Sequence, residues 1–530
     1  MEMAAGTDGE IKKLQVQEYG SLLVGDLIDK EINIAAIVDD VVGGKDSQDG
    51  PSVGDYFFYT ILNRMIGAKS KRALPEWYKS TAIQHVRPVR LEALSSRHYW
   101  RAWEKVSEAH IKEIAERFFA KLVEQENVSS DCFLFDTTNY YTYMASSTES
   151  DLAKRGKNKE GKNWLRQVGL ALLVSSDEQL PLYYQEYEGN RHDSKVFKDL
   201  LEDVVKAMHK RVGPQTSLTI AFDKGMNAFD NIAILDGYDD IHFITSYSTA
   251  YAEELIKMKT DQFIVVDTEI NKRLAANGKE DDQLLAWRTT GEYWGAERTV
   301  VVTYNPRTAT KQRYNFEIKL LKLQQHLFEM QSNVQANRSH WRDKVQIMKR
   351  YEELCGTLHI PKNLYTVELY KKDKKLRMNF RKNHHRLKTY IARFGKNILI
   401  TDRHDWSTDD IVKLSLDRYK VEKAFRQTKD DDLVSLMPLY HWTDSKIRCH
   451  ILCCVVALAY LRLIERKLSN SGVEISAKTA METMHTLHSC LVFHPRKRNP
   501  QRLIEDPTKS QAQILKAFGL KVSSGVLQGC

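Results

Sequence analysis

The chain has 530 residues, and at about one domain per 150 residues this length predicts three or four structural units. Hydrophobic residues make up 42% and charged residues 28%, which excludes a disordered or collagen-like chain. The 79 Lys and Arg against 70 Asp and Glu give a net charge of +9, too small by itself to indicate a nucleic-acid partner.

The positive charge is concentrated in one stretch. Between Lys371 and Lys396 lie eleven Lys or Arg and a single acid, Asp373, so this stretch alone carries the excess charge of the chain. Aromatic residues such as Phe380 and Tyr390 are interleaved with it. This pattern is typical of a surface that follows DNA phosphates, because each neutralised phosphate releases a counterion. A solvated strand pair or helix face explains the same charges equally well.

Two further patterns concern the cellular environment. The seven cysteines are scattered without a Cys-x-x-Cys pair, which predicts reduced thiols in a cytoplasmic protein. Cys449, Cys453 and Cys454 flank His450 in an apolar run, so we expect buried thiols there and no structural zinc. The longest apolar run, 451–461, is shorter than the roughly 20 residues that cross a bilayer. Residues 1–13 lack the features of a secretory signal.

The predicted elements begin with a helical region, residues 1–128, in which apolar residues recur three and four apart. Its basic stretch, residues 63–77, either contacts DNA ends or forms a surface loop between helices. At residue 129 the period changes to short β-rich runs. Strands are expected at 132–135, 167–174, 180–187, 217–223 and 241–247, with helices at 193–212 and 227–235. This order predicts an α/β fold with helices packed on a mixed sheet.

Residues 249–405 are expected to form an insertion that contains the basic cluster. Strands are predicted at 284–294, 298–305, 363–370 and 398–402, and one long helix at roughly 312–353. From 406 the helical period returns, with Ser407 or Thr408 as N-cap. We assign residues 129–248 to the first part of a core, 406–468 to its completion, and 469–530 to a C-terminal helical region.

Three acids are candidates for catalysis. Asp136 follows the apolar run CFLF and Asp223 follows LTIAF, so each is predicted at the carboxyl end of a buried strand, where ligands gather in open α/β sheets. A simple turn after a strand is the alternative for each aspartate. Glu422 lies on a predicted helix in a row with Arg418, Arg426 and Lys429 on one face. The neighbouring residues Val421, Ala424, Phe425 and Thr428 are expected to pack that helix onto the sheet.

Three converging carboxylates need positive charge, and two Mg²⁺ or Mn²⁺ ions with oxygen ligands supply it. Such a pair activates a nucleophile on one side of a phosphate and stabilises the leaving oxygen on the other. Arg418, Arg426 and Lys429 are then expected to hold neighbouring DNA phosphates.

Five segments in this order and spacing carry a family resemblance: LFDTTNYY, GNRHDSKVF, IAFDKGMN, DRYKVEKAFRQTK and MPLYHWTDSKIRCHI. Together they resemble DDE insertion-sequence transposases of the superfamily with a Tyr-Arg-Glu-Lys signature around the catalytic glutamate. The resemblance covers nearly the whole chain and implies a ribonuclease-H-like core interrupted by a β-rich insertion. It assigns the metal-ligand roles to Asp136, Asp223 and Glu422, and it matches Arg418 and Lys429 to the signature arginine and lysine.

One signature position differs, because Ser415 stands where the tyrosine is expected and the nearest tyrosine is Tyr419. The Tyr-His-Trp segment, residues 440–442, is similar to another branch of the superfamily. Asn190 and Asp193 either line the same crevice or form a turn with a helix cap. Trp287 and Trp294 either stack on a flipped base or pack in a core. The basic stretch 154–166 is expected to form a hairpin that orders on DNA.

These patterns predict a cut-and-paste transposase that acts as a homodimer on terminal inverted repeats and target DNA in the nucleoid. The residues expected to bind DNA are Arg418, Arg426, Lys429, Lys374, Lys375, Arg377, Arg381 and Lys382. The alternatives are a domesticated DNA-binding protein without chemistry and a ribonuclease-H-like nuclease.

Overall fold

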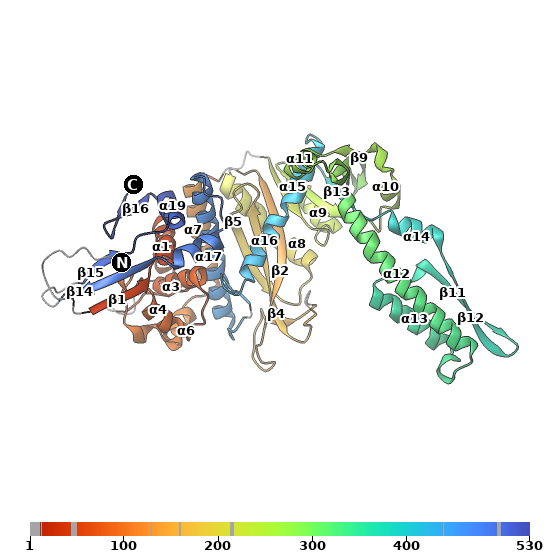
Figure 1. Cartoon of the computed structure of the whole chain (residues 1–530), viewed down its shortest axis with the longest axis horizontal. Coiled ribbons are helices and arrows are strands. Elements are labelled where there is room, and N and C mark those ends of the chain that lie inside the picture. The colour runs from red at the N-terminus through yellow and green to blue at the C-terminus, as the bar shows by residue number, and fades with distance from the viewer. Residues whose placement is uncertain are drawn as a thin grey trace. The chain divides into compact units, whose positions relative to one another are not determined.

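The computed structural model describes residues 11, 13–43, 50–128, 130–157, 161–212, 217–437, 439–494 and 500–529. The chain forms two compact units, and each unit is built from more than one stretch of the sequence. Unit 1 is Met1–Ala221, Ala233–Ile241 and Asp417–Cys530, and unit 2 is Phe222–Ile232 and His242–Leu416. Both units combine strands with helices, so the predicted α/β class is confirmed (Figure 1).

The helices of unit 1 gather around the long helix α17 (Asp444–Asn470), which contacts α1, α3, α6 and α7 (Figure 1). By length and composition α17 could span a membrane, but 94% of its most apolar window is buried inside the protein. The prediction of a buried core helix is therefore confirmed. The helices before the sheet are α1 (Gly20–Ile32), α2 (Ile34–Val42), α3 (Val53–Ile66), α4 (Leu74–Ser80), α5 (Ile83–Val86), η1 (Leu91–Leu94), α6 (Ser96–Glu104) and α7 (Glu108–Glu126).

The sheet of unit 1 is mixed. Strand β2 (Cys132–Thr142) pairs antiparallel with β4 (Arg166–Ser175) on one side and parallel with β6 (Leu218–Phe222) on the other. Strands β3 (Lys154–Arg155) and β5 (Pro181–Glu188) both pair antiparallel with β4. Helix α8 (Asp193–Val212) follows β5, and α16 (Tyr419–Thr428) packs on β2 and β4. The strands and helices predicted for this part of the chain are confirmed.

The C-terminal region was expected to be helical, and this prediction holds for two helices but misses four strands. Alongside α18 (Ala477–His485) and α19 (Lys509–Ala517) it contains β14 (His488–Phe493), β15 (Gln501–Ile504), β16 (Leu520–Ser523) and β17 (Val526–Gly529). Strand β1 (Lys13–Glu18), in the N-terminal region also expected to be helical, pairs antiparallel with β14. The three-stranded sheet of β1, β14 and β15 forms because residues far apart in the sequence pair with each other. A local sequence pattern does not reveal such pairing.

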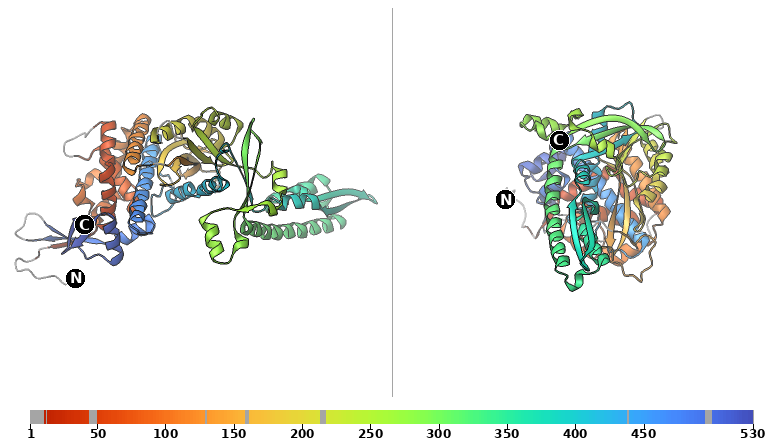
Figure 2. Two further views of the ribbon diagram at one scale, coloured as in Figure 1. Left: turned by 90° about the horizontal axis from the view of Figure 1, so that it is seen from above. Right: turned by 90° about the vertical axis from the view of Figure 1, so that its right-hand side faces the viewer.

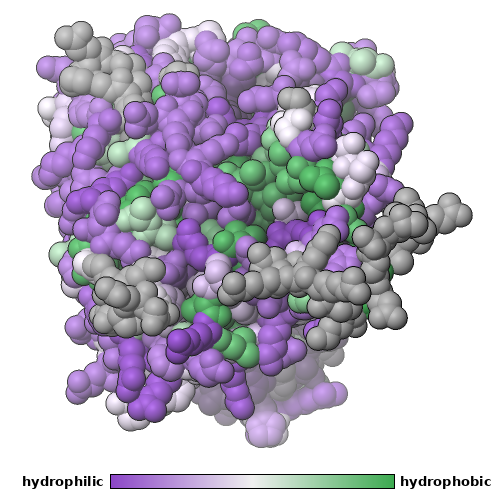
Figure 3. Space-filling view, turned by 90° about the vertical axis from the view of Figure 1, so that its left-hand side faces the viewer, coloured by the Kyte–Doolittle hydropathy of each residue, from purple (hydrophilic) through white to green (hydrophobic). Residues whose placement is uncertain are grey.

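One face of this small sheet carries apolar side chains. Leu14 is 50% exposed and Val16 64% exposed, and with Cys490, Val492 and Leu503 they line a cavity of about 170 Å³. Figure 3 shows hydrophobic side chains in patches among hydrophilic ones on the face seen from the left-hand side of Figure 1.

Unit 2 has its own antiparallel strands, in the order β7 (Ile241–Tyr247), β13 (Lys396–Thr401), β10 (Ala296–Tyr304), β9 (Leu285–Tyr293) and β8 (Ile264–Val265). The shorter helices that lie wholly or mostly in this unit are α9 (Phe229–Leu235), α10 (Glu253–Lys257), η2 (Thr260–Gln262), α11 (Glu269–Ala276), η3 (Glu280–Asp282), η4 (Ser339–Trp341), η5 (Lys362–Leu364), α14 (His384–Ile391) and α15 (Thr408–Asp417). The predicted strands 284–294, 298–305 and 398–402 correspond to β9, β10 and β13.

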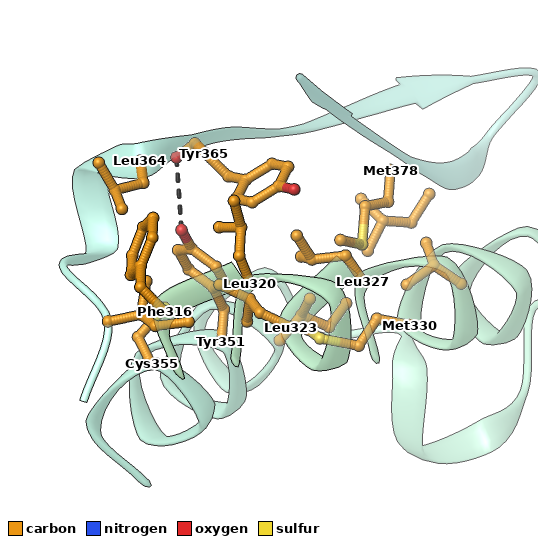
Figure 4. Close-up of a cluster of buried hydrophobic side chains, with 14 residues drawn as sticks. Phe316, Leu320, Leu323, Leu327, Met330, Tyr351, Cys355, Leu364, Tyr365 and Met378 are labelled. Carbon is orange, nitrogen blue, oxygen red and sulfur yellow. Dashed lines mark hydrogen bonds between the residues drawn. The ribbon is translucent and has the colours of Figure 1, made fainter. Parts of the chain in front are cut away.

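Between β10 and β13 the chain forms a helical subdomain. Helices α12 (Pro306–Gln335) and α13 (Lys344–Leu358) lie beside the hairpin of β11 (Tyr365–Lys372) and β12 (Lys375–Lys382) (Figure 2). Leu323 and Leu327 from α12, Tyr351 from α13 and Met378 from β12 meet in one buried cluster (Figure 4). The expected β-rich insertion is therefore half helical.

The single long helix predicted at 312–353 is two helices. The backbone of α12 ends at Ala336, and Asn337 adopts a positive φ of 53°. The side chain of Asp343 then accepts hydrogen bonds from the N–H groups of Val345 and Gln346 and starts α13. Apolar periodicity continues across the break because both helices face the same core, so the sequence pattern does not mark it.

Candidate active site and DNA-binding surface

Asp136 lies in the middle of β2, where it pairs with Leu172 of β4. The prediction that it ends a strand is therefore wrong. The residues after it are mostly β-branched or aromatic, and these types continue the strand to Thr142. The carboxylate is half-buried and accepts a hydrogen bond of 2.8 Å from the N–H of Thr137.

Glu422 is exposed on the first turn of α16. The opposite face of that helix buries Val421, Ala424, Phe425 and Thr428, as predicted, and it packs on β2 and β4. The hydroxyl of Thr428 donates its one proton to the carbonyl of Phe425. It therefore accepts the hydrogen bond of 2.5 Å from the hydroxyl of Tyr140 in β2. Burial raises the pKa of Tyr140, which keeps this donor protonated. Glu422 and Asp136 thus lie on elements of unit 1 that pack together.

The cations around Glu422 lie on one short helix and at its two ends. Helix α15 ends at Asp417, and Arg418 caps the N-terminus of α16. Lys429 is the C-cap, and its ammonium group lies 5.5 Å from the centre of the Tyr140 ring. Arg418 has a helical backbone, and its carbonyl accepts a hydrogen bond from the N–H of Glu422, so it lies one turn before Glu422. Arg426 is exposed one turn beyond Glu422. The predicted row therefore spans α16 and its two cap residues.

Asp223 directly follows β6, as predicted, and belongs to unit 2. The hydroxyl of Ser246 donates to its carboxylate at 3.2 Å, and the side chain of Asn227 donates to the carbonyl of Ser246 at 2.9 Å. Sequence reasoning missed Ser246, although its place near the end of the predicted strand 241–247 was a usable signal.

The parallel pairing of β2 with β6 aligns Leu134 with Ala221. Asp136 lies two residues beyond Leu134, and Asp223 lies two residues beyond Ala221. Among the described residues, no group of three or more His, Cys, Asp or Glu side chains is gathered closely enough to hold a metal ion.

The first part of the basic cluster, residues 371–382, lies in the β11–β12 hairpin, and the rest lies on α14 and between α14 and the start of β13. Asp373 and Lys374 both have positive φ, which is typical of a two-residue type I′ turn. Leu376, Met378 and Phe380 face the helices, so the alternate residues of β12 face solvent.

The cations of this hairpin therefore divide between its two faces. Lys375, Arg377 and Arg381 belong to the solvent face, where Arg381 is 3.5 Å from Glu368. Lys382 lies on the other face, with its ammonium group 6.0 Å from the centre of the Tyr365 ring. Arg377 also donates to the carbonyl of Gln335 at the end of α12. The solvent face of the hairpin thus carries three cations of β12, and Lys382 is not one of them.

The other positions singled out in the sequence are found in several parts of the fold. Trp287 and Trp294 pack against an apolar cluster of unit 2, and Trp294 contacts the rings of Tyr247 and Tyr293. Asp193 is the first residue of α8. Asn190 is exposed in the turn before α8, Ser415 lies in α15, and Tyr419 is exposed at the start of α16.

Two sequence predictions are described only in part. Residues 158–160 of the basic stretch 154–166, and Cys530, lie outside the described residues. The other six cysteines form no disulfide, and Cys449, Cys453 and Cys454 are buried as expected.

Comparison with known proteins gave no match to a protein-family model and none to a characterised protein. Among solved structures, the piggyBac transposase in its synaptic complex with hairpin DNA aligns with a TM-score of 0.41 and 9% identity, over 88% of this chain and 79% of that chain. The Mos1 transposase in a paired-end complex with the left transposon end aligns with a TM-score of 0.16 and 12% identity, over 40% of this chain and 63% of that one. TM-scores below 0.5 do not establish a common fold.

Proposed function

We propose that this protein is a metal-dependent DNA transposase in which Asp136, Asp223 and Glu422 together hold two Mg²⁺ or Mn²⁺ ions. The observation that carries the proposal is the parallel register of β2 with β6, in which both aspartates stand two residues beyond a paired position. The packing of α16 on β2 adds support, because it keeps the element with Glu422 beside the strand with Asp136.

The chemistry of the donor set fits hard divalent cations, which prefer carboxylate oxygens. Such ions, when bound, polarise the scissile phosphate and activate a water or a 3′-hydroxyl for in-line attack. The chain's own residues orient the strand. Arg426, one turn beyond Glu422, and the flanking Arg418 and Lys429 are proposed to hold adjacent phosphates without reading sequence.

We propose double-stranded DNA as the partner, held along the solvent face of the β11–β12 hairpin. Lys374 in the turn and Lys375, Arg377 and Arg381 on β12 supply the positive charge. Because two transposon ends must be cut and joined together, the active form is proposed to be a homodimer on DNA in the nucleoid.

The test is cleavage of a supercoiled plasmid that carries the gene with several hundred base pairs of its flanking DNA. Asp136→Asn and Asp223→Asn are each expected to lower Mg²⁺-dependent nicking by at least about a thousandfold, because each removes one anionic metal ligand. Binding to the flanking DNA should stay within a few-fold of wild type. Asp239→Asn, a change of the same kind at an exposed residue, should leave both activities intact.

Two outcomes would contradict the proposal. Full nicking activity in both variants would show that these carboxylates take no part in catalysis. Nicked products without strand-transfer products, in wild type and across several targets, would identify a plain nuclease in place of a transposase.

A further inference from the structure

Unit 1 contains a cavity of about 400 Å³ in which three distant parts of the sequence meet. The first runs from Arg64 at the end of α3 to Arg72, the second is the start of α6, and the third lies between the end of α16 and the first turns of α17. The lining holds four Lys or Arg side chains against one acid, Asp431. The side chains that matter for its chemistry are Arg64, Lys71, Trp100, Tyr440, His441 and His450.

Two cations are buried at this cavity without a carboxylate partner in the described part of the chain. Lys71 is only 4% exposed, and its ammonium group lies 4.8 Å from the centre of the Trp103 ring and 5.8 Å from that of Tyr99. Arg64 is 7% exposed and donates to the backbone carbonyls of Lys69, Val434 and Ser435. Its Nε has no hydrogen-bond acceptor among the residues that the structure describes.

Two imidazoles stand beside these cations. The rings of His441 and His450 are 4.5 Å apart, and both are buried. Burial lowers the pKa of each histidine well below its usual value, and the next largest cause is the charge of Lys71 for His441 and the neighbouring His441 for His450. Among the described residues, Nδ1 of His441 has no hydrogen-bond partner. A neutral imidazole with a free ring nitrogen can donate one hydrogen bond to an anion in the cavity.

A purely structural role leaves this charge arrangement unexplained. Cation–π contact offsets only part of the free-energy cost of burying an unpaired charge. Lys71 and Arg64 also repel each other, which further lowers the pKa of Lys71 after burial itself. An anionic ligand removes both penalties at once.

The mouth of the cavity is aromatic. Tyr440 is 67% exposed, and Trp100 is half-buried with its ring 5.2 Å from that of His441. The volume lies within the range of about 300 to 1,000 Å³ that is usual for small-ligand sites. An exposed ring beside a cationic pocket is suited to a base attached to a phosphate.

We propose that this cavity binds the phosphate group of a nucleotide, with Lys71, Arg64 and His441 facing the phosphate and Trp100 and Tyr440 facing the base. The nucleotide is either free or part of a DNA strand. The site does not depend on the three carboxylates, so it can be tested whether or not the protein cleaves DNA.

The experiment is calorimetric titration of the full chain with inorganic phosphate, with dAMP and with a short 5′-phosphorylated single-stranded oligonucleotide. Lys71→Met is expected to weaken all three by about tenfold or more, because a charge-assisted contact is lost. Lys79→Met, which removes an exposed lysine of α4, should bind as wild type. Arg72→Gln, at an exposed residue of the cavity, provides a second variant that keeps the core intact, and weaker binding is expected.

Comparison of the ligands distinguishes a nucleotide within a DNA strand from a free nucleotide. Tighter binding of the oligonucleotide than of dAMP identifies a nucleotide within a strand, and equal binding identifies a free nucleotide. Trp100→Leu should bring the affinity for dAMP down to that for inorganic phosphate. The proposal is overturned when wild type binds none of the three ligands, or when Lys71→Met and Arg72→Gln both bind as tightly as wild type.

Discussion

At the scale of single residues, Lys71 has the environment least suited to a lysine. Burial, and then the neighbouring charge of Arg64, lowers its pKa from 10.5 to about 7. Cys449, Cys453 and Cys454 face it from α17, and burial raises the pKa of each thiol. These thiols and the two histidines therefore stay neutral near pH 8, and Lys71 is the group of this cluster that changes charge there.

This shift predicts how stability depends on pH. Below about pH 7 Lys71 is charged in both the folded and unfolded protein, and the cost of burying the charge is fully present. Between pH 7 and 10.5 the unfolded state binds the proton more tightly, so raising the pH relieves the cost, by at most about 5 kcal/mol. The free energy of unfolding of Lys71→Met minus that of wild type should therefore be positive at pH 6 and fall steadily toward pH 10.

Urea unfolding at several pH values in phosphate-free buffer measures this difference, and subtraction removes the groups that both proteins share. Lys79→Met provides the baseline, since an exposed lysine should give a small difference that does not change with pH. A flat difference for Lys71→Met as well would mean that water reaches its ammonium group in solution.

At the scale of elements, the β11–β12 hairpin shows what strand alternation does to a charge cluster. The sequence has lysines and arginines in a dense run, but pairing in the hairpin sends alternate side chains to opposite faces. Lys375, Arg377 and Arg381 share the solvent face, and Lys382 lies over the ring of Tyr365. Membership of the cluster therefore does not by itself make a residue available to DNA.

Salt dependence of DNA binding tests this division. The triple change Lys375→Gln, Arg377→Gln and Arg381→Gln should lower the slope of log affinity against log salt concentration by about 0.9 per lost phosphate contact, up to about 2.7. Lys382→Gln should leave the slope unchanged. A triple Gln variant at the exposed Lys311, Arg313 and Lys322 of α12 controls for net charge, and a slope as low as that of the hairpin variant would place DNA elsewhere.

At the scale of the whole molecule, the helical subdomain between β10 and β13 is an insertion in a hairpin. Tyr304 pairs with Lys396, and the N–H of Asn305 donates to the carbonyl of Gly395 at 2.8 Å. Residues 306–394 thus leave and re-enter unit 2 at adjacent points. The subdomain has its own buried cluster, from Phe316 to Met378 (Figure 4).

Deletion of residues 306–394 should therefore give a folded protein. The join places Asn305 next to Gly395, and Asn-Gly is a favoured two-residue turn between antiparallel strands. Gly395 already has a positive φ of 72°. We expect a cooperative thermal transition and the circular dichroism of a mixed α/β protein. The slope of log DNA affinity against log salt concentration should fall by the amount that the hairpin contributes.

The control is deletion of residues 304–394, which leaves Gly395 alone between Thr303 and Lys396 and cannot close a two-residue turn. It should unfold at a lower temperature than the 306–394 deletion. Equal stability of the two variants would show that the β10–β13 pairing does not depend on this register, and aggregation of both would show that the subdomain stabilises unit 2.

The sequence alone determined the features that depend on neighbouring residues. Apolar periodicity predicted the strands of the β2 to β7 region, the helices α8 and α9, and the buried face of α16, because helices and strands have fixed repeats along the chain. The sequence also singled out Asp136 and Asp223, which follow apolar runs predicted as strands, and Glu422, which lies on a predicted helix.

Only the tertiary structure decided which distant segments meet. The pairing of β1 with β14 added a sheet to ends of the chain that were expected to be helical. Which face of the basic hairpin is covered likewise depends on its packing against α12 and α13. The cavity lined by residues 64–72, 96–100 and 431–450 cannot be predicted from any one of these segments, because its chemistry arises from burying cations together with side chains from the other segments.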